Sequence, residues 1–439
     1  MAPRLVLATL GVLALSLIVR SQDAPALRLS EVTDPMGQGF PIPADIRGTM
    51  PGVNSFGSPY LLLNKTDGLA LWYVQGGHVY PVAFEGGQVP KGKAAPQVVN
   101  SGGNWFLMYV VDGGNEFWRL DAEQAKPVTL PDGKLFSQRS HITRGGDKAV
   151  LYQGDYTGKT DLYEIDGETA RAIRVTDKTD HGTAQYAWHV GGKLLVAFYI
   201  NGTHDFYWLA DGAFKACWER NGTQDDELQI DSIHAAWWNG QLFLNLVRRD
   251  ASAEVWTVRD GKLASVSDKA ASWYKEGLVA AGRDGLYFIG NGALEVSDGK
   301  TTRTIRHGDD PLTLDTKAAL TSQGGGVLVN VRNFDEFTCW LVGDSAHKLG
   351  THKIGSVARY VLAASTGATD IVQFSDEQGV PHWKVFKAGK ESETGVEGAP
   401  EDFGAIESAW SVAESGKQVS YTVERKAGTK ASFRLWRLQ

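Results

Sequence analysis

The stretch KLLVAFYINGTHDFYWLADGAFKACWE, Lys193 to Glu219, decides the fold of this chain. It consists of three short runs of alternating polar and apolar residues, separated by turns that contain Gly202 and Gly212. Runs rich in Val, Tyr, Phe, Trp and Leu and bounded by Gly, Asp and Asn predict β-strands joined by tight turns. The unit is therefore a meander of three strands, and similar units recur along nearly the whole chain.

The recurrence is clearest in the third run of each unit, where an aromatic residue usually stands. Aligned on that position, the anchors are Trp72, Trp118, Tyr163, Tyr207, Trp256, Leu294, Trp340, Trp383 and Trp436. Their mean step is roughly 45 residues, which is the period of four-stranded propeller blades. An apolar run such as LLVAFYI precedes each anchor, a short strand follows most of them, and a fourth strand such as QYAWHV begins the unit.

These units predict an all-β propeller of four-stranded blades. No convincing long amphipathic helix is found, which argues against a parallel sheet with helical crossovers. Radial repetition buries sheet faces against neighbouring blades and protects their edges, so a propeller is favoured over a barrel or sandwich. Nine units predict nine blades. The unit around Leu294 is short and lacks the aromatic residue, so eight blades with one degenerate hairpin is the alternative. The anchors are expected to pack between blades rather than to stack on ligands.

The two ends of the chain are expected to meet. The last unit stops at Gln439, directly after its third strand, and the segment PALRLSEV, Pro25 to Val32, could supply the missing outer strand. Pairing of these strands would close the ring, so deletion of residues 25 to 32 should lower the melting temperature by many degrees. The predicted organisation is a signal peptide (1–21), an N-terminal segment (22–50) and a propeller (51–439).

The N-terminus predicts export. Arg4 precedes an apolar run from Leu5 to Val19, which fits a signal peptide with cleavage after Ser21. We expect a secreted, periplasmic or extracellular protein with no membrane span after cleavage, and an uncleaved signal anchor is the alternative. Three glycosylation sequons matter only if the source is eukaryotic, and they begin at Asn64, Asn201 and Asn221.

Charge and cysteine content narrow the possible partners and the redox chemistry. Lys and Arg total 44 against 51 Asp and Glu, a net charge of -7 with no basic block, which argues against nucleic-acid binding. Cys217 and Cys339 are the two cysteines, and their places in the repeat put them far apart in a ring. Two buried, unpaired thiols are therefore predicted, with one disulfide as the alternative in an exported chain.

The last unit carries a resemblance to a known superfamily. Ala409 to Tyr421 reads AWSVAESGKQVSY, which resembles the Trp-Ser-Pro-Asp-Gly-Lys signature of the WD40-like repeats in TolB-type propellers. Leu162 to Asp177, LYEIDGETARAIRVTD, looks like the third strand, turn and fourth strand of the same repeats. The resemblance covers the other units loosely, and the signature proline is absent here. It implies an exported propeller used as a binding platform.

Candidate site residues lie just before or at the start of each first strand, because these positions surround the mouth of a propeller channel. They are Arg139, His141, Gln185, Tyr186, Asp231, His234, Lys317, Arg359, Tyr360 and Glu407. If chemistry occurs there, His141 and His234 are the candidates for proton transfer, and Arg139 and Arg359 for holding an anionic group. The remaining residues are candidate ligand contacts. The alternative is a wide, wet channel whose polar lining performs no reaction.

No metal or cofactor is expected. DKTDHGTAQ, Asp177 to Gln185, lacks the spacing of a calcium loop, and the usual zinc pairs are absent. The glycine run in QGGGV, Gln323 to Val327, sits between two strands rather than opening a helix, so a phosphate cradle is disfavoured. The chain also contains no G-x-S-x-G stretch, which argues against a serine hydrolase.

The predicted function is recognition or scaffolding of a protein or glycan partner by a monomer. The alternative is a carbohydrate-active or other small-anion enzyme, a lyase or hydrolase, with its site in the central funnel. A purely structural surface protein is a third possibility. Convergence of the funnel residues within hydrogen-bonding distance would favour the enzyme, and scattering would favour recognition.

Overall fold

A computed structural model describes most of the chain beyond its N-terminus. The described residues are 27–40, 59–65, 68–87, 89, 96–133, 136–137, 139–154, 160–176, 181–217, 230–273, 278–314, 318–354, 359–366, 369–378, 380–387, 389–392, 396–414, 417–426 and 433–438. Across these ranges the chain forms strands, turns and loops and no helix. Accordingly, no helix in this part of the chain is long and apolar enough to cross a membrane. The predicted signal peptide lies outside the described residues.

The first half of the chain forms successive antiparallel sheets in which neighbouring strands are also consecutive in sequence. The first sheet has three strands, β2 (Tyr60–Lys65), β3 (Gly68–Gln75) and β4 (His78–Pro81). Four-stranded groups follow, formed by β6 (Gln97–Ser101), β7 (Asn104–Val111), β8 (Gly114–Asp121) and β9 (Gln124–Val128); β10 (Ser140–Ile142), β11 (Val150–Gly154), β12 (Thr160–Asp166) and β13 (Thr169–Ala172); and β14 (Thr183–Val190), β15 (Lys193–Ile200), β16 (Thr203–Ala210) and β17 (Ala213–Ala216). The short β5 (Ala83–Phe84) lies parallel to β9.

The second half continues the same pattern. Its groups are β18 (Ile230–Trp238), β19 (Gln241–Arg248), β20 (Ala253–Arg259) and β21 (Lys262–Ala270); β22 (Val279–Ala281), β23 (Leu286–Gly290), β24 (Ala293–Ser297) and β25 (Thr302–Thr304); β28 (Ala318–Gln323), β29 (Gly326–Asn333), β30 (Glu336–Val342) and β31 (Ala346–Lys353); and β32 (Arg359–Thr366), β33 (Thr369–Ser375), β34 (Pro381–Lys387) and β35 (Lys390–Ser392). A small hairpin of β26 (Arg306–His307) and β27 (Asp310–Pro311) follows β25. The short unit around Leu294 thus has four strands of its own, joined to β21 only through Ala270 and Gly290.

The N-terminal segment joins the last sheet to the first. β1 (Leu27–Glu31) pairs antiparallel with β39 (Phe433–Leu438). In the same sheet, β39 pairs with β38 (Lys417–Arg425), and β38 pairs with β37 (Ala405–Glu414). β1 also pairs in parallel with β36 (Val396–Glu397). Beyond β1, the amide of Val32 donates to the Leu435 carbonyl at 2.8 Å, and Thr33 bridges to His78 of β4. The segment therefore contacts both ends of the strand series, where the sequence predicts the pairing of the termini.

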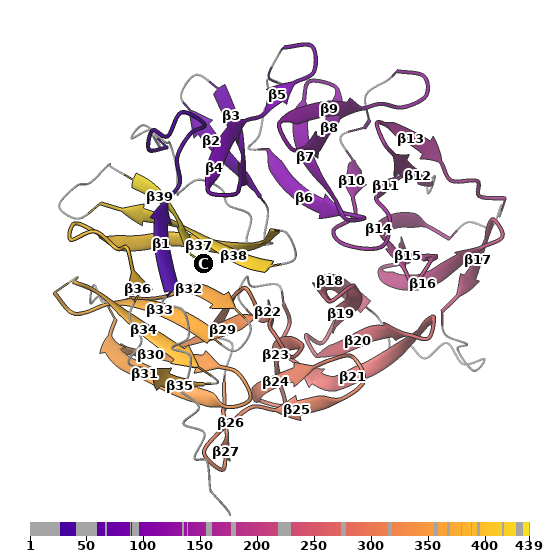
Figure 1. Cartoon of the computed structure of the whole chain (residues 1–439). Coiled ribbons are helices and arrows are strands. Elements are labelled where there is room, and N and C mark those ends of the chain that lie inside the picture. Colours follow the sequence, from indigo (N-terminus) through magenta and orange to yellow (C-terminus); the bar gives the residue numbers. More distant parts are fainter. Residues whose placement is uncertain are drawn as a thin grey trace, which may run out of the picture.

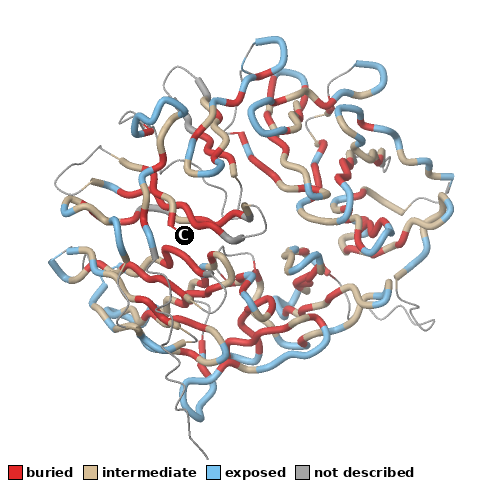
Figure 2. Tube along the Cα trace, in the orientation of Figure 1, coloured by how far each residue is buried: buried red, intermediate tan, exposed pale blue. Residues whose placement is uncertain are grey.

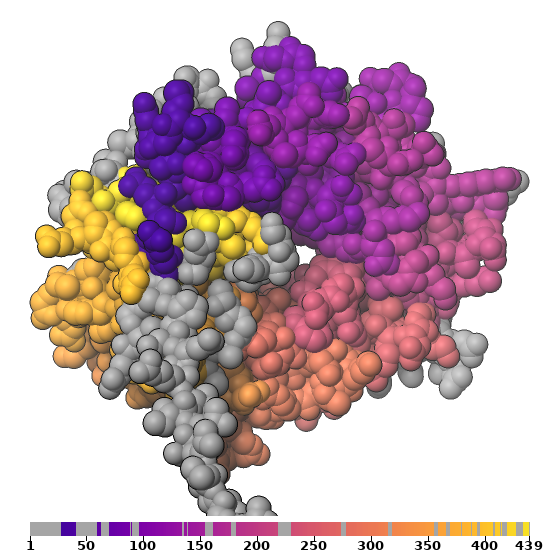
Figure 3. All heavy atoms as spheres, viewed as in Figure 1, coloured from indigo at the N-terminus to yellow at the C-terminus, as the bar shows by residue number. Residues whose placement is uncertain are grey.

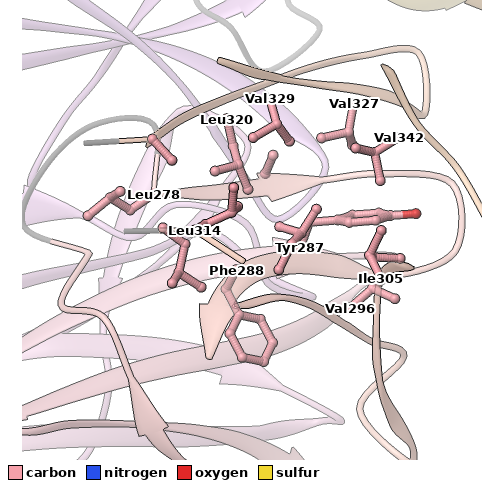
Figure 4. Packing of buried hydrophobic residues seen from close by; sticks show 14 of the residues in the cluster. Leu278, Tyr287, Phe288, Val296, Ile305, Leu314, Leu320, Val327, Val329 and Val342 are labelled. Atoms are coloured by element: carbon pink, nitrogen blue, oxygen red, sulfur yellow. The ribbon is translucent and has the colours of Figure 1, made fainter. Parts of the chain in front are cut away.

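Figure 1 shows these sheets side by side around a common centre, and Figure 3 shows an opening that remains there when all atoms are drawn. Buried residues follow the strands, whereas exposed residues concentrate in the turns (Figure 2). Clusters of buried apolar side chains lie between neighbouring sheets. In the cluster shown in Figure 4, Tyr287 of β23 points toward Val327 of β29 and Val342 of β30, whereas the neighbouring Phe288 points the opposite way and contacts the ring of Trp273. A separate cluster joins Leu61 and Val74 of the first sheet to Trp410, Tyr421 and Leu435 of the last.

The aligned anchors all belong to these clusters. Trp72, Trp118, Tyr163, Tyr207, Trp256, Leu294, Trp340, Trp383 and Trp436 are each buried in, or packed against, an intersheet core. The prediction that the anchors serve packing is confirmed. Trp383 differs from most of the others because it packs toward the following sheet, with its ring 5.4 Å from that of Phe403.

Buried amides tie second strands to the segments that lead into the next sheet. Asn245 of β19 accepts from the Trp273 amide at 2.9 Å, and Gln373 of β33 accepts from the Ile406 amide at 2.8 Å. The Gln373 side chain also donates to the Gly404 carbonyl at 3.1 Å. Asn245 and Gln373 are 0% and 2% exposed, so these bonds form in a low-dielectric interior where an unmade bond would be costly. They fix the start of the next first strand.

The glycine run 324–326 allows two nonadjacent sheets to touch. Arg283, which follows β22, reaches past this run to Asp370 of β33, with a nitrogen–oxygen distance of 3.2 Å. A Cβ on Gly326 would lie 2.7 Å from an Asp370 carboxylate oxygen. The run joins β28 to β29, as the sequence predicts. Because it has no side chains, it leaves room for the Arg283–Asp370 ion pair.

Both cysteines are unpaired, as the sequence predicts. Cys217 directly follows β17 and is half-buried, whereas Cys339 is buried in β30. Burial raises the pKa of the Cys217 thiol to about 12 and also raises the pKa of Cys339. Neither thiol is therefore ionised at neutral pH, which makes both poor nucleophiles.

Candidate functional site at the channel mouth

The described candidate residues lie in or just before first strands, most of them near the face of the molecule at which these strands begin. We call it the mouth face, and we call the opposite face, where first and second strands are joined, the hairpin face. Because strands alternate in direction, the mouth face also carries the ends of second strands and the starts of third strands. Lys317 lies outside the described residues. Glu407 belongs to β37, and its side chain also lies outside what the structure describes.

β-Bulges place three of the predicted polar residues. Pairing of β14 with β15 skips Gln185, pairing of β18 with β19 skips Asp231, and pairing of β37 with β38 skips Glu407. A bulge adds one unpaired residue and re-aims its side chain. Gln185 and Asp231 are both exposed, in strands whose neighbouring Ala184 and Ile230 are buried. The recurrence of the bulge at the start of first strands explains why polar side chains stand at the mouth face there.

Aromatic and imidazole rings gather beside two of these bulges. The ring of His141, on β10, lies 5.6 Å from that of Tyr152, on β11. Tyr152 in turn interacts electrostatically with Tyr186, which stacks on Trp188 at 5.6 Å with an interplanar angle of 1°. His204, on β16, lies 6.0 Å from Tyr186. We call His141, Tyr152, Gln185, Tyr186, His204 and Asp231 the mouth-face cluster.

Burial keeps the titratable rings of the cluster uncharged. It lowers the pKa of His141, although this residue is accessible to solvent, because the ring rests against Tyr152. The pKa of His204 is also lowered by burial, and the Ile230 carbonyl and the charges of Asp231 and Asp205 only partly oppose that effect. Burial raises the pKa values of Tyr152 and Tyr186. At neutral pH the cluster therefore presents neutral imidazoles and protonated phenols.

The hydrogen bonds divide the cluster into residues that hold its structure and residues whose polar groups remain available to a ligand. His204 is 2% exposed and bonds to the Ile230 carbonyl at 3.1 Å and to the Gln185 side chain at 3.0 Å. Within the described ranges, neither the hydroxyls of Tyr152 and Tyr186 nor the ring nitrogens of His141 have a hydrogen-bond partner. His204 thus anchors the bulge, and three neutral groups are left for a ligand.

His234 lies apart from this cluster. It is on β18, opposite Asn245 of β19, and separated from His141 by the sheet of β14–β17. Its Nε2 atom is buried and has no hydrogen-bond partner among the described residues. Burial lowers its pKa. In the described part of the chain no carboxylate contacts either His141 or His234, so the structure does not bring together a base and an orienting acid.

Arg359 and Tyr360 lie in a second group on β32. The Tyr360 hydroxyl is 2.8 Å from His352 Nε2, on β31, and its ring stacks on Phe374 at 5.7 Å. Burial raises the pKa of Tyr360 to about 12. Its hydroxyl is thus already engaged, whereas that of Tyr186 is available. Arg359 is exposed at the start of the same strand, and Arg139 is half-buried before β10.

Tyr152 and His204 are members that the sequence does not indicate. Both lie within second or third strands, where the alternation of the sequence marks them only as strand residues. Tyr152 reaches Tyr186 from the preceding sheet, whereas His204 lies two strands away from Tyr186 in the same sheet. The signal in the sequence is a polar residue directly after an apolar one, as in AQYAW and IDSIH. It indicates the bulge residues Gln185 and Asp231, and not Tyr152 or His204 beside them.

Solved structures similar to this chain include propeller domains. A prolyl endopeptidase structure aligns with 14% identity and a TM-score of 0.38, covering 77% of this chain and 55% of that chain. The WD40 domain of SCAP from fission yeast aligns with 11% identity and a TM-score of 0.38, covering 94% of this chain and 98% of that one. The propeller domain of the Trilobed protease from Pyrococcus furiosus gives 10% identity and a TM-score of 0.31, over 70% of this chain and 98% of that one.

This chain spans only about half the length of the prolyl endopeptidase that it matches. No protein-family model matches the chain, and no curated protein matches it in sequence.

Proposed function

We propose that this protein is an exported, nine-bladed β-propeller that recognises a protein or glycan partner through its mouth face. The blade count rests on nine successive strand groups, the last of which consists of β37, β38, β39 and β1. Ring closure is supported by the pairing of β1 with β39 and by the core shared between the first and last sheets. Export is supported by the apolar run from Leu5 to Val19.

The mouth-face cluster carries the functional part of the proposal. His141, Tyr152 and Tyr186 offer hydrogen-bonding groups that no described residue uses, at a surface where His204 and Trp188 hold the neighbouring rings in place. Binding sites commonly combine apolar rings with a few oriented polar groups on a rigid scaffold. A group that is held in place without a partner loses little entropy when it binds one.

The same geometry weighs against the enzyme alternative. General acid–base catalysis needs a titratable group whose pKa lies near the working pH and, for histidine, a partner that orients the ring. His141 and His234 are separated by a sheet and have no carboxylate partner in the described part of the chain. Recognition requires neither feature.

A thermal-shift screen tests this function. The purified protein is screened against glycans, uronic acids and divalent metals, together with a His141→Ala/Tyr186→Ala variant. Lys193→Ala/Gln124→Ala, which changes exposed residues at strand starts on the hairpin face, is the matched control. A ligand at one hundred times its Kd adds about 2.7 kcal/mol, or about 3 °C for a chain of this size.

The expected result is a shift in the wild type and the control that the mouth-face variant loses, with the ligand recovered unchanged after prolonged incubation. An equal shift in the mouth-face variant would show that recognition occurs elsewhere. Conversion of the ligand into product would favour the enzyme alternative. Signal-peptide cleavage is tested separately, by N-terminal sequencing of exported protein, which should begin at Gln22.

A further inference from the structure

We propose that the mouth-face cluster binds a neutral oligosaccharide, with a sugar ring against the partly exposed Tyr186 and sugar hydroxyls bonded to the phenols of Tyr152 and Tyr186 and to His141. This inference rests on the proposed function, because it names the ligand class of the same surface. The cluster extends over β10, β11, β14, β16 and β18, and thus over three neighbouring sheets. That extent suits a chain of sugars better than a single one.

The rings supply the contact area. Tyr186 is the partly exposed tyrosine ring of the cluster, whereas Tyr152 and Trp188 are 8% and 4% exposed. The parallel stack of Tyr186 on Trp188 fixes the orientation of the Tyr186 ring. An aromatic face carries partial negative charge, so it attracts the C–H groups that line one face of a pyranose. Tyrosine provides this area with only two side-chain torsions to immobilise, which keeps the entropic cost of binding low.

The available polar groups match sugar hydroxyls. A hydroxyl both donates and accepts hydrogen bonds, and so does a phenol, while a neutral imidazole offers one donor and one acceptor. Tyr152, Tyr186 and His141 therefore offer both roles without carrying charge. The exposed Gln185 and Asp231 add an amide and a carboxylate at the border of the same cluster.

The charges around the cluster favour a neutral ligand over an acidic one. Asp231 and Asp205 both lie close enough to His204 to affect its pKa, and each would repel a uronic acid or sulfated sugar. His141 and His204 provide no positive charge at neutral pH, because burial lowers both pKa values. Two cations partly offset these carboxylates: Arg139 lies two residues before His141, and Arg249 donates to the carbonyl of Gly202, two residues before His204, at 3.2 Å. Acidic sugars are therefore included in the test.

Isothermal titration of the purified protein tests the proposal, with neutral gluco- and galacto-oligosaccharides as probes and oligogalacturonate as the acidic comparison. The variants are Tyr186→Ala, Tyr186→Phe and Tyr152→Phe. Tyr80→Phe is the matched control, because this half-buried tyrosine lies in β4 of the first sheet and is not a candidate site residue. Circular dichroism and melting curves establish that each variant is folded.

We expect at least one neutral oligosaccharide to bind. Tyr186→Ala should weaken it by more than tenfold, and each Phe variant, which removes one hydroxyl, should weaken it about threefold to tenfold. Tyr80→Phe should bind like the wild type. The two Phe variants keep the test decisive if Tyr186→Ala fails to fold.

Three outcomes would overturn the proposal: tighter binding of oligogalacturonate than of any neutral sugar, neutral binding that the Tyr variants leave unchanged, or no sugar binding at all. If no sugar binds but another ligand's thermal shift is lost in His141→Ala/Tyr186→Ala, the glycan inference is wrong and the proposed function stands. If the mouth-face variants change no binding of any kind, both are wrong.

Discussion

Leu29 provides the most quantitative test of how the chain holds its two ends together. It lies in β1, opposite Leu438 of β39, and is 3% exposed. Its neighbours in the core include Trp436 of the last sheet and Ala363 and Ile371 of the sheet before it. Replacing Leu29 with Ala removes buried methyl groups from a junction between two sheets and leaves the backbone pairing of β1 intact.

The size of the effect follows from the burial. Leu→Ala substitutions at fully buried sites cost about 2–5 kcal/mol, because lost burial and a residual cavity add together. Unfolding entropy of about 2.1 cal/mol/K per residue gives roughly 0.85 kcal/mol/K if some 400 residues unfold as one unit. Leu29→Ala should therefore lower the melting temperature by about 2–6 °C.

The assay is differential scanning calorimetry of the wild type, Leu29→Ala and Arg28→Ala. Arg28 is the matched control, since it lies in the same strand with an exposed side chain. Its loss should change the melting temperature by less than 1 °C, because exposed substitutions are usually worth less than about 0.5 kcal/mol. Equal melting temperatures for all three proteins would refute the reasoning, since they would mean that β1 separates before the ring unfolds.

Three further predictions follow from single residues. Gly102→Ala should destabilise the protein far more than Gly103→Ala in melting experiments: both glycines have positive φ, but a Cβ on Gly102 would lie 2.2 Å from a backbone nitrogen, and one on Gly103 meets nothing within 4 Å. The free energy of unfolding should fall as the pH drops from 7 toward 5, and His204 should contribute up to about 1.4 kcal/mol per pH unit to that fall. The reason is that the pKa of His204 is lower in the folded than in the unfolded chain, so the unfolded chain takes up the proton first. A His204→Gln variant with the same pH dependence in denaturant titrations would contradict this. Cys217 and Cys339 should resist a thiol reagent at pH 8 in the native protein and both react after denaturation, whereas rapid native labelling would contradict their burial.

Much of the architecture follows from local sequence patterns. The strand units and their anchors could be predicted because alternation and turn residues act over a few positions, and all the anchors lie in intersheet cores. The direction of Trp383 could not be predicted, since a shift of one residue in a strand reverses the face on which a side chain lies. Among the described residues the first sheet has three strands, and residues 41–58, where a strand before β2 would stand, lie outside the described part of the chain.

The site was predictable only in part. Gln185 and Asp231 interrupt the apolar pattern of their strands, so the sequence marks them, and the structure shows them as bulge residues. The place of Tyr152 depends on which sheets become neighbours, and that of His204 depends on the register of β14, β15 and β16, and no local pattern carries either kind of information. His141 and His234 look equivalent in sequence, yet one lies beside Tyr152 and the other faces a different intersheet space.

The most direct test of recognition at the mouth-face cluster is to compare the wild type, Tyr186→Ala and Tyr80→Phe for binding to an array of neutral and acidic oligosaccharides at pH 7.5. We expect the wild type and Tyr80→Phe to bind the same neutral sugars and Tyr186→Ala to lose them. Binding that Tyr186→Ala retains in full would contradict the account, because the ligand would then contact another part of the molecule.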